Sequence, residues 1–282
     1  MEKYLWFVFA DGELLLEKHD DGTYTIPAGE QPPIVLPPDV QPHHISPMDD
    51  GTNVMAAGID GKRNVDDKAY EWCQLRGSYY KLPTDLYLKA GKCQEILYWD
   101  RHTRYCGVCG APMELHTDIS KRCTRCGREV WPQLATAIIV LVHRKRIDVS
   151  TREEVDEVLL VHARNFRGNF YGLVAGFVET GETLEEAVHR EVMEETGITI
   201  RNLRYFGSQP WPYPCGLMVG FHADYESGDI HLQAEELSKG AWFRRDHLPQ
   251  IPEKLSIARR LIDDWLENNF ENNSTNYCQN KK

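Results

Sequence analysis

Between Gly176 and Ile198 a short segment carries many carboxylates at helical spacing. It reads Gly176-x5-Glu182-x7-Arg190-Glu191-Val192-x-Glu194-Glu195-x-Gly197. Thr183 and Glu186 have the spacing of a capping box, which predicts that a helix begins there. Gly197 is suited to ending that helix, because glycine readily adopts the left-handed conformation of a C-terminal cap.

One face of this predicted helix changes from aliphatic to acidic. At about 100° per residue, Leu184, Ala187 and Val188 lie on one side. The same side continues into three glutamates: Glu191, Glu194 and Glu195. Carboxylates crowded toward a core repel one another and lose hydration unless cations neutralise them. We therefore expect Mg²⁺ or Mn²⁺, which prefer oxygen ligands. The alternative is a solvated acidic helix face.

These residues match every fixed position of the Nudix box, and the chain resembles the Nudix hydrolases. The resemblance implies an α/β/α sandwich, with the box as a loop, a helix and a loop beside a mixed sheet. It also implies metal-dependent hydrolysis of a diphosphate linked to a nucleoside. By position, Glu191, Glu195 and the Ala175 carbonyl correspond to metal ligands. Glu194 corresponds to a further ligand or to the carboxylate that orients or deprotonates water, and Arg190 to a partner of a box glutamate.

Eight cysteines are present, and four of them have metal-ligand spacing. The pairs Cys106-x2-Cys109 and Cys123-x2-Cys126 are separated by 13 residues, and a glycine follows each pair. Four thiolates in such pairs favour tetrahedral Zn²⁺ with no open position, so we expect a structural zinc ribbon. Two disulfides or a redox pair are the alternative.

The hydrophobic pattern divides the chain of 282 residues into four parts. We expect an α+β organisation with a mixed α/β domain at 1–103, the zinc ribbon at 104–131, the Nudix domain at 132–270 and a disordered tail at 271–282. A buried strand is expected over Tyr4–Ala10, and helices over 85–101 and 255–270. Further strands are expected over 137–142, 158–163, 203–208 and 217–225, and a charged surface hairpin or loop over 145–156.

Composition limits the class of partner. The net charge is −11 and the pI is about 5.5, which argues against broad electrostatic binding of nucleic acid. It leaves open the engagement of an RNA end through metals and a pocket. The apolar run Tyr4–Ala10 is too short to span a membrane, and Asp11 follows it without a cleavage signal. We expect a cytoplasmic protein without membrane association.

Downstream of the box lies the segment Ser208-Gln209-Pro210-Trp211-Pro212-Tyr213-Pro214. Its prolines remove backbone donors, so it is not an ordinary central strand. Such a stiff segment would display Gln209, Trp211 and Tyr213, and its aromatic rings suit stacking on a flat ligand. The alternative is a rigid loop that packs these aromatic rings into the core.

This segment resembles the signature of the NADH pyrophosphatase branch of the Nudix family, which also carries a four-cysteine ribbon. The resemblance implies hydrolysis of NADH or NAD⁺ to nicotinamide mononucleotide and AMP, removal of NAD caps from RNA, and a homodimer. By position, it implies one further metal ligand, Glu236. It implies substrate contacts by Phe177, Gln209, Pro210, Trp211, Pro212, Tyr213, Pro214, Trp131, Ala258 and Arg76, although Arg76 is equally compatible with a surface residue.

The chain departs from the family pattern at three positions. Tyr213 stands in place of the usual phenylalanine, Gly216 in place of serine, and Trp131 in place of tyrosine. Two alternatives to an NAD(H) diphosphatase therefore remain open. One is a broader dinucleotide or ADP-ribose diphosphatase, and the other is a non-catalytic regulator that binds nucleotides or RNA. Retention of all box carboxylates favours an enzyme over a regulator.

Overall fold

The computed structural model describes residues 3–164 and 168–267. The chain contacts define two compact units. The first contains the chain up to Leu134 together with Pro210–Cys215, and the second contains Ala135–Gln209 and the chain from Gly216 onward. Each unit is described by itself below. The tail expected at 271–282, and the last three residues of the expected Nudix domain, lie outside the described residues.

A seven-stranded sheet forms the core of the first unit. Its strand order is β3-β2-β1-β6-β5, with β4 paired to β1 and β7 paired to β2. The predicted strand Tyr4–Ala10 is confirmed as β1, in which Phe7 and Val8 are completely buried. The other strands are β2 (Glu13–Lys18), β3 (Tyr24–Thr25), β4 (Ala28–Gly29), β5 (His43–Ile45), β6 (Asn53–Ile59) and β7 (Tyr70–Gln74).

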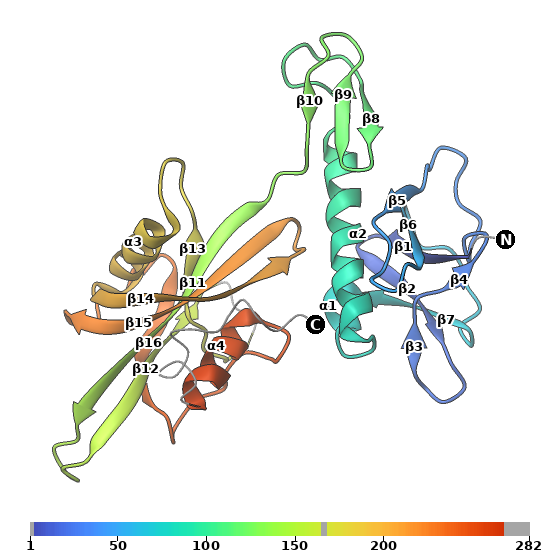
Figure 1. Cartoon of the computed structure of the whole chain (residues 1–282). Coiled ribbons are helices and arrows are strands. Elements are labelled where there is room, and N and C mark those ends of the chain that lie inside the picture. The colour runs from blue at the N-terminus through green and yellow to red at the C-terminus, as the bar shows by residue number, and fades with distance from the viewer. Residues whose placement is uncertain (1–2, 165–167, 268–282) are drawn as a thin grey trace. The chain divides into compact units, whose positions relative to one another are not determined.

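Two helices follow this sheet: α1 (Leu75–Ser78) and α2 (Thr84–His102). Helix α2 confirms the helix expected over 85–101, and it leads directly into a small three-stranded sheet (Figure 1). That sheet has the order β10-β9-β8 and consists of β8 (Met113–Thr117), β9 (Ser120–Cys123) and β10 (Glu129–Val130).

Lys121 joins the small sheet to the end of α2. Its side chain is almost fully buried, and Nζ donates to the carbonyls of Asp100 (2.8 Å) and Thr103 (3.0 Å). The Asp100 carboxylate lies 2.6 Å from the same ammonium group. Burial works against ionisation of Asp100, but hydrogen bonds from His43 and Lys121 lower its pKa to about 2. The small sheet is therefore anchored by a charged and fully bonded lysine.

The second unit is a helix-sheet-helix sandwich. Its mixed sheet has the order β14-β15-β11-β12-β16, with β13 paired to β11. Strands β11 and β15 are parallel, and β11 is antiparallel to β12. The strands are β11 (Ala135–Ile147), β12 (Glu154–Ala163), β13 (Val174–Phe177), β14 (Thr199–Trp211), β15 (Gly216–Ser227) and β16 (Leu237–Arg244).

Alternating residues of β11 face opposite layers of this sandwich. Ile138 and Val140 belong to the core beneath α3 (Leu184–Thr196), whereas Ile139 and Leu141 belong to the core beneath α4 (Ile257–Leu266). This alternation follows from the two-residue period of a strand. The expected α/β/α sandwich is thereby confirmed, and Figure 1 separates α3 and α4 across the sheet.

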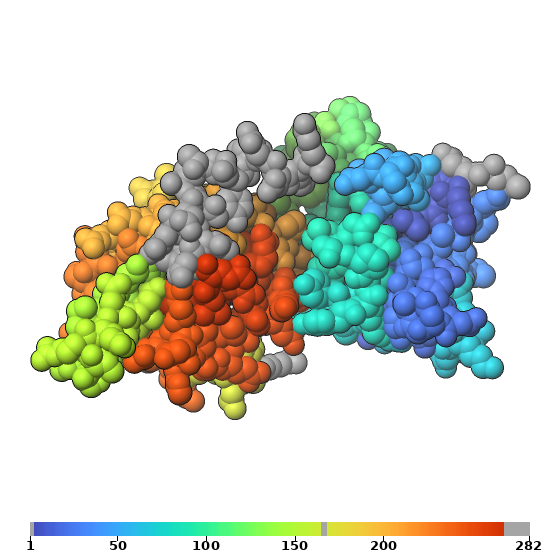
Figure 2. Space-filling view, turned by 60° about the horizontal axis from the view of Figure 1, so that its bottom comes forward, coloured from blue at the N-terminus to red at the C-terminus, as the bar shows by residue number. Residues whose placement is uncertain are grey.

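The segment expected as a charged hairpin or loop over 145–156 is the end of a long hairpin. Strand β11 continues to Ile147 and β12 resumes at Glu154, and Figure 2 shows this end, in yellow-green, extending from its unit. Arg144 and Arg146 both pair with the carboxylate of Glu157, at 2.7 and 2.8 Å. The charged residues therefore bond across strands rather than forming an irregular loop.

Two strands differ from the sequence expectation. Strand β14 is longer than the expected 203–208 and passes through Pro210, which is tolerated because β14 is the edge strand of its sheet. Strand β16 was not predicted, because Ser238-Lys239-Gly240 interrupts its apolar residues and the sequence shows no clear alternation. No helix in the described part of the chain is long and apolar enough to cross a membrane.

Candidate active site

Helix α3 has the termini that its sequence predicts. The Thr183 hydroxyl accepts from the Glu186 amide at 3.2 Å, and the Glu186 carboxylate accepts from the Thr183 amide at 2.8 Å. Gly197 ends the helix in the left-handed conformation, with φ of 71°. These caps fix which turn of α3 lies against β13.

Gly176 on β13 is in direct contact with Glu191 on α3. A β-carbon at residue 176 would lie 2.0 Å from the Glu191 carboxylate, a distance that real side chains do not tolerate. The absence of a side chain at Gly176 therefore allows the carboxylate to lie against the strand backbone. Ala175, the preceding residue, packs its side chain against the core beneath α4.

Four carboxylates interact electrostatically at this point: Glu191, Glu194, Glu195 and Glu236. Glu191 and Glu195 are 9% and 4% exposed, and they lie one turn apart on α3. Burial, together with the charges of Glu191 and Glu236, raises the pKa of Glu195 to about 8. Burial, with the charges of Glu194 and Glu236, also raises the pKa of Glu191, although Arg190 opposes this shift. The site therefore holds more negative charge than its protein surroundings neutralise.

Glu194 does not lie inward, and the expectation of three buried glutamates is wrong for this residue. Its side chain is 54% exposed, and Oε2 accepts from Arg190 at 3.1 Å. At about 100° per residue, Glu194 is rotated roughly 60° from Glu191 and lies at the border of the buried face. It is available to solvent beside the buried pair.

Arg190 connects most of the box. Its guanidinium donates to both oxygens of Glu182, at 2.5 and 2.9 Å, and to the Phe177 carbonyl at 3.0 Å. It also donates to Glu191 at 2.8 Å. Hydrogen bonding with Arg190 lowers the pKa of Glu182 to about 2. Arg190 thus bonds to box glutamates, as expected, and its planar donors hold several groups at once.

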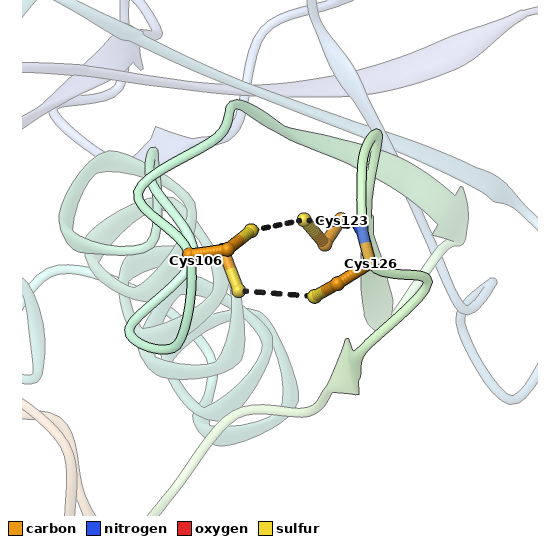
Figure 3. Close-up of side chains that lie close together, drawn as sticks. Cys106, Cys123 and Cys126 are labelled. Carbon is orange, nitrogen blue, oxygen red and sulfur yellow. Dashed lines mark hydrogen bonds between the residues drawn. The ribbon is translucent and has the colours of Figure 1, made fainter.

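The four cysteines of the predicted zinc ribbon converge, as their spacing predicts. Figure 3 labels three of them, Cys106, Cys123 and Cys126. Their sulfurs all lie within 4.8 Å of one another, with Cys106 Sγ 3.7 Å from Cys126 Sγ and Cys109 Sγ 3.4 Å from Cys123 Sγ. Zn–S bonds of about 2.3 Å in a tetrahedron place sulfurs about 3.8 Å apart, so this donor set fits a structural zinc ion.

The backbone supports thiolates in this ribbon. The amides of Cys126 and Arg125 each donate to Cys123 Sγ at 3.4 Å, and they lower the pKa of that thiol to about 6. The Val108 amide donates to Cys106 Sγ at 3.4 Å and lowers its pKa as well. Amide bonds of this kind favour the deprotonated form that binds metal.

The part of the proline-rich segment from Pro210 to Pro214, called the proline-aromatic segment below, belongs by its contacts to the first unit. Pro212 is buried against α2, where a β-carbon at Gly91 would lie 3.0 Å from its ring. The Tyr213 hydroxyl lies 3.0 Å from the Tyr87 hydroxyl. The Trp211 ring meets Tyr213 edge-on at 5.1 Å. The rings of Trp211 and Tyr213 are thus partly buried and in contact with each other.

Other predicted substrate residues differ in exposure. Phe177 and Trp131 are 66% and 53% exposed, so their rings are accessible. Arg76 lies over the Trp211 ring at 5.6 Å and is thereby joined to the proline-aromatic segment. Ala258 lies on α4 and is buried against the core, which leaves little of its side chain for a ligand.

Gln209 is not displayed, in contrast to the sequence expectation. It is buried in the second unit, and its side-chain amide donates to the Leu255 carbonyl at 2.9 Å. The change of unit between Gln209 and Pro210 explains the difference, because the two residues pack in separate environments. Pro210 and Pro214 are exposed.

Two contacts of the candidate site were missed from the sequence. Tyr87 bonds to the proline-aromatic segment, but no local pattern on α2 distinguishes it from an ordinary core tyrosine. The Glu182 carboxylate accepts hydrogen bonds from Arg190. Its fixed position in the Nudix box could have indicated this contact.

Comparisons with known proteins cover almost all of the described chain. Residues 3–99 match an NADH pyrophosphatase-like rudimentary NUDIX domain, residues 101–130 an NADH pyrophosphatase zinc ribbon domain, and residues 140–266 a NUDIX domain. A NUDIX hydrolase structure from Nitrosomonas europaea aligns with a TM-score of 0.47 at 19% identity, over 60% of this chain and 93% of that one.

Curated relatives carry the name NAD-capped RNA hydrolase NudC. The Pectobacterium atrosepticum protein is 45% identical over 64% of this chain and 66% of its own length. The Chromobacterium violaceum protein is 38% identical over 76% of each chain. With the box, the ribbon and these relatives together, the chain belongs to the NudC family of Nudix hydrolases.

Proposed function

We propose that this protein hydrolyses the diphosphate of NAD(H) to nicotinamide mononucleotide and AMP. We also propose that it removes NAD caps from RNA and leaves a 5′-monophosphate. The observation that carries the proposal is the contact of the Glu191 carboxylate with Gly176, beside the buried Glu195 and close enough to Glu236 for their charges to interact. The name of the relatives supports the choice of substrate.

The donors suit Mg²⁺ or Mn²⁺, because they are oxygens with excess negative charge. Glu191, Glu195, Glu236 and the Ala175 carbonyl would hold the metal, with Glu194 as a further candidate ligand. Among the described residues, the group of side chains already close enough together to hold a metal ion is the four cysteines of the ribbon. When bound, the metal would supply charge neutralisation to the phosphoryl oxygens.

Glu194 is the proposed acceptor for the proton of the attacking water. The water oxygen forms a bond to one phosphorus, the bond between that phosphorus and the bridging oxygen breaks, and the bridging oxygen leaves with the other phosphate. The water proton passes to the Glu194 carboxylate. This side chain is exposed, so a water molecule can reach its carboxylate. Arg190 would act by positioning Glu191 and Glu194 rather than by touching the substrate.

The exposed rings of Phe177 and Trp131 are proposed to stack on bases of the substrate. Arg76 and residues 210–214 are proposed to line the substrate pocket. Gln209 and Ala258 are buried, so any contribution from them would be through the shape of neighbouring backbone. We further propose that the protein is a cytoplasmic homodimer, which light scattering on the purified protein and fractionation of cells would test.

The alternative is a broader dinucleotide or ADP-ribose diphosphatase. It is based on the departures from the family pattern at Tyr213 and Gly216. The Tyr213 hydroxyl pairs with Tyr87, so the additional polar group already has a protein partner. This observation favours an unchanged pocket over a redirected one. The alternative of a regulator is disfavoured because every box carboxylate is retained.

The test is turnover of NADH, NAD⁺, ADP-ribose and NAD-capped RNA with Mn²⁺ or Mg²⁺, with products identified by mass. Nicotinamide mononucleotide with AMP, or 5′-monophosphate RNA, is expected. Turnover of ADP-ribose alone would contradict the proposal. Glu191→Gln should lower kcat by a factor of about 100 or more while zinc content and unfolding temperature stay unchanged. Full activity of that variant would refute the metal role.

A further inference from the structure

The zinc ribbon is positively charged in a chain that is otherwise strongly acidic. Residues 101–130, the range that matches the zinc ribbon domain, contain six arginine and lysine residues against three acidic residues, a formal net charge of +3, whereas the whole chain carries −11. Four cysteine thiolates with one bound Zn²⁺ lower the charge of the ribbon to about +1, which is still opposite in sign to that of the chain. Such a reversal of sign in a small module marks a surface suited to an anionic partner.

Half of these cations are engaged within the protein. Lys121 pairs with Asp100, Arg101 with Asp60 and Arg122 with Glu129. The other three cations form no ion pair within residues 3–164 and 168–267, and all are exposed: Arg104, Arg125 and Arg128. Arg125 donates one hydrogen bond to the Cys109 carbonyl at 3.3 Å. Their positive charge is therefore not neutralised by neighbouring carboxylates.

Arg128 borders a hollow in the ribbon of about 240 Å³. Tyr105, Met113 and Val130 contribute its aromatic and aliphatic wall, and Thr103 contributes a hydroxyl. The Tyr105 side chain is 66% exposed, although tyrosine rings are commonly half-buried in cores. The volume is below the roughly 300 Å³ at which pockets for drug-sized ligands begin, so it suits a single base rather than a dinucleotide.

We propose that this hollow binds one nucleotide of the RNA body behind the NAD cap. A base stacks on Tyr105, while Arg128 and its neighbouring arginines contact phosphates. An exposed aromatic ring beside unneutralised guanidinium groups is the combination that single-stranded nucleic acids require. The inference rests on the proposed function, since it concerns the same substrate. It assigns the ribbon a role in RNA binding in addition to its structural zinc.

The test compares NADH with a short single-stranded NAD-capped RNA, using the full chain with zinc bound. Tyr105→Ala and Arg128→Glu should each raise KM for the capped RNA by about fivefold or more, with NADH kinetics unchanged. Tyr105→Phe keeps the ring and should behave as the unmodified protein. Arg63→Glu is the matched control, because it makes the same charge change at an exposed site outside the ribbon.

Two further measurements separate this inference from the proposed function. Arg128→Glu should reduce the salt dependence of capped-RNA binding by a slope of about 0.7, the value for one lost phosphate contact on a single strand. Anisotropy of a labelled 5′-monophosphate RNA reports binding without turnover. Equal RNA affinity and equal KM in all variants would overturn the inference. The unmodified protein could hydrolyse neither substrate while the ribbon variants still bind RNA more weakly than it does. That result would overturn only the proposed function.

Discussion

The backbone at Gly176 and the carboxylate of Glu191 approach so closely that no side chain fits between them. A β-carbon there would lie 2.0 Å from Cδ and from Oε1 of Glu191. This contact joins β13 to α3 at the point where the acidic residues meet. Close packing against Glu191 is therefore sufficient to explain why residue 176, at the start of the box, is a glycine.

Gly176→Ala should therefore displace Glu191 and lower kcat by about a hundredfold, because small displacements of catalytic groups are costly. Steady-state kinetics and circular dichroism check this expectation. Gly207→Ala is the control, since its β-carbon would meet Arg260 at an ordinary 3.8 Å. Equal activity of the two variants would mean that the position of Glu191 is not critical.

Arg190→Lys should lower activity by about tenfold or more although the charge is kept. Arginine bonds to Glu182, Glu191 and the Phe177 carbonyl at once, and an ammonium group does not reproduce this planar geometry. The apparent Mn²⁺ affinity should weaken in parallel, which titration would measure. Arg259→Lys, at an intrahelical pair on α4, should leave activity unchanged. A loss in Arg190→Lys without any change in metal affinity would contradict positioning of Glu191.

Tyr87 and Tyr213 should show coupled effects on stability. Their hydroxyls lie 3.0 Å apart, and removal of either leaves the other without this partner. Tyr87→Phe and Tyr213→Phe should each cost about 1 kcal/mol, and the double variant should cost less than their sum. Denaturant unfolding of the four proteins measures the coupling. Strictly additive effects would mean that the hydroxyl pair is not a stabilising bond.

Glu95 should make the first unit less stable as the pH rises. Its Oε1 is buried and has no hydrogen-bond partner among the described residues, and burial raises its pKa from 4.5 to about 7. The folded state then binds more protons than the unfolded state between these values. Stability is consequently lost as pH rises from about 4.5 to 7, and the loss is complete above that range.

Glu95→Gln should raise stability at pH 8 by roughly 1 kcal/mol, after allowance for partial solvent screening, and should have little effect at pH 4.5. Thermal unfolding at the two pH values provides the measurement. Glu114→Gln on the exposed part of β8 serves as the control. If Glu95→Gln and Glu114→Gln changed the stability equally at both pH values, burial of Glu95 would not be the cause of the pH dependence.

Removal of zinc should unfold the ribbon. Its small core consists largely of the cysteines and a few neighbours such as Ala111 and Met113, which is too little to fold without the metal. Metal analysis should find one zinc ion per chain, and a strong chelator should abolish protection of β8 and β9 amides from hydrogen exchange. Cys73→Ser should leave the zinc content at one, whereas Cys123→Ser should lower it. Retained ribbon protection after full zinc loss would refute a structural metal.

Local patterns in the sequence sufficed for several features of this protein. The capping box at Thr183, the cysteine spacing and the aliphatic run of β11 depend on residues close together in the chain. Their backbone geometry follows from those neighbours, so the box helix and ribbon were predictable. Only the tertiary structure decided that Gln209 is buried and that Pro212 packs on Gly91. These outcomes depend on which distant surface covers each side chain, and that information is not contained in local spacing.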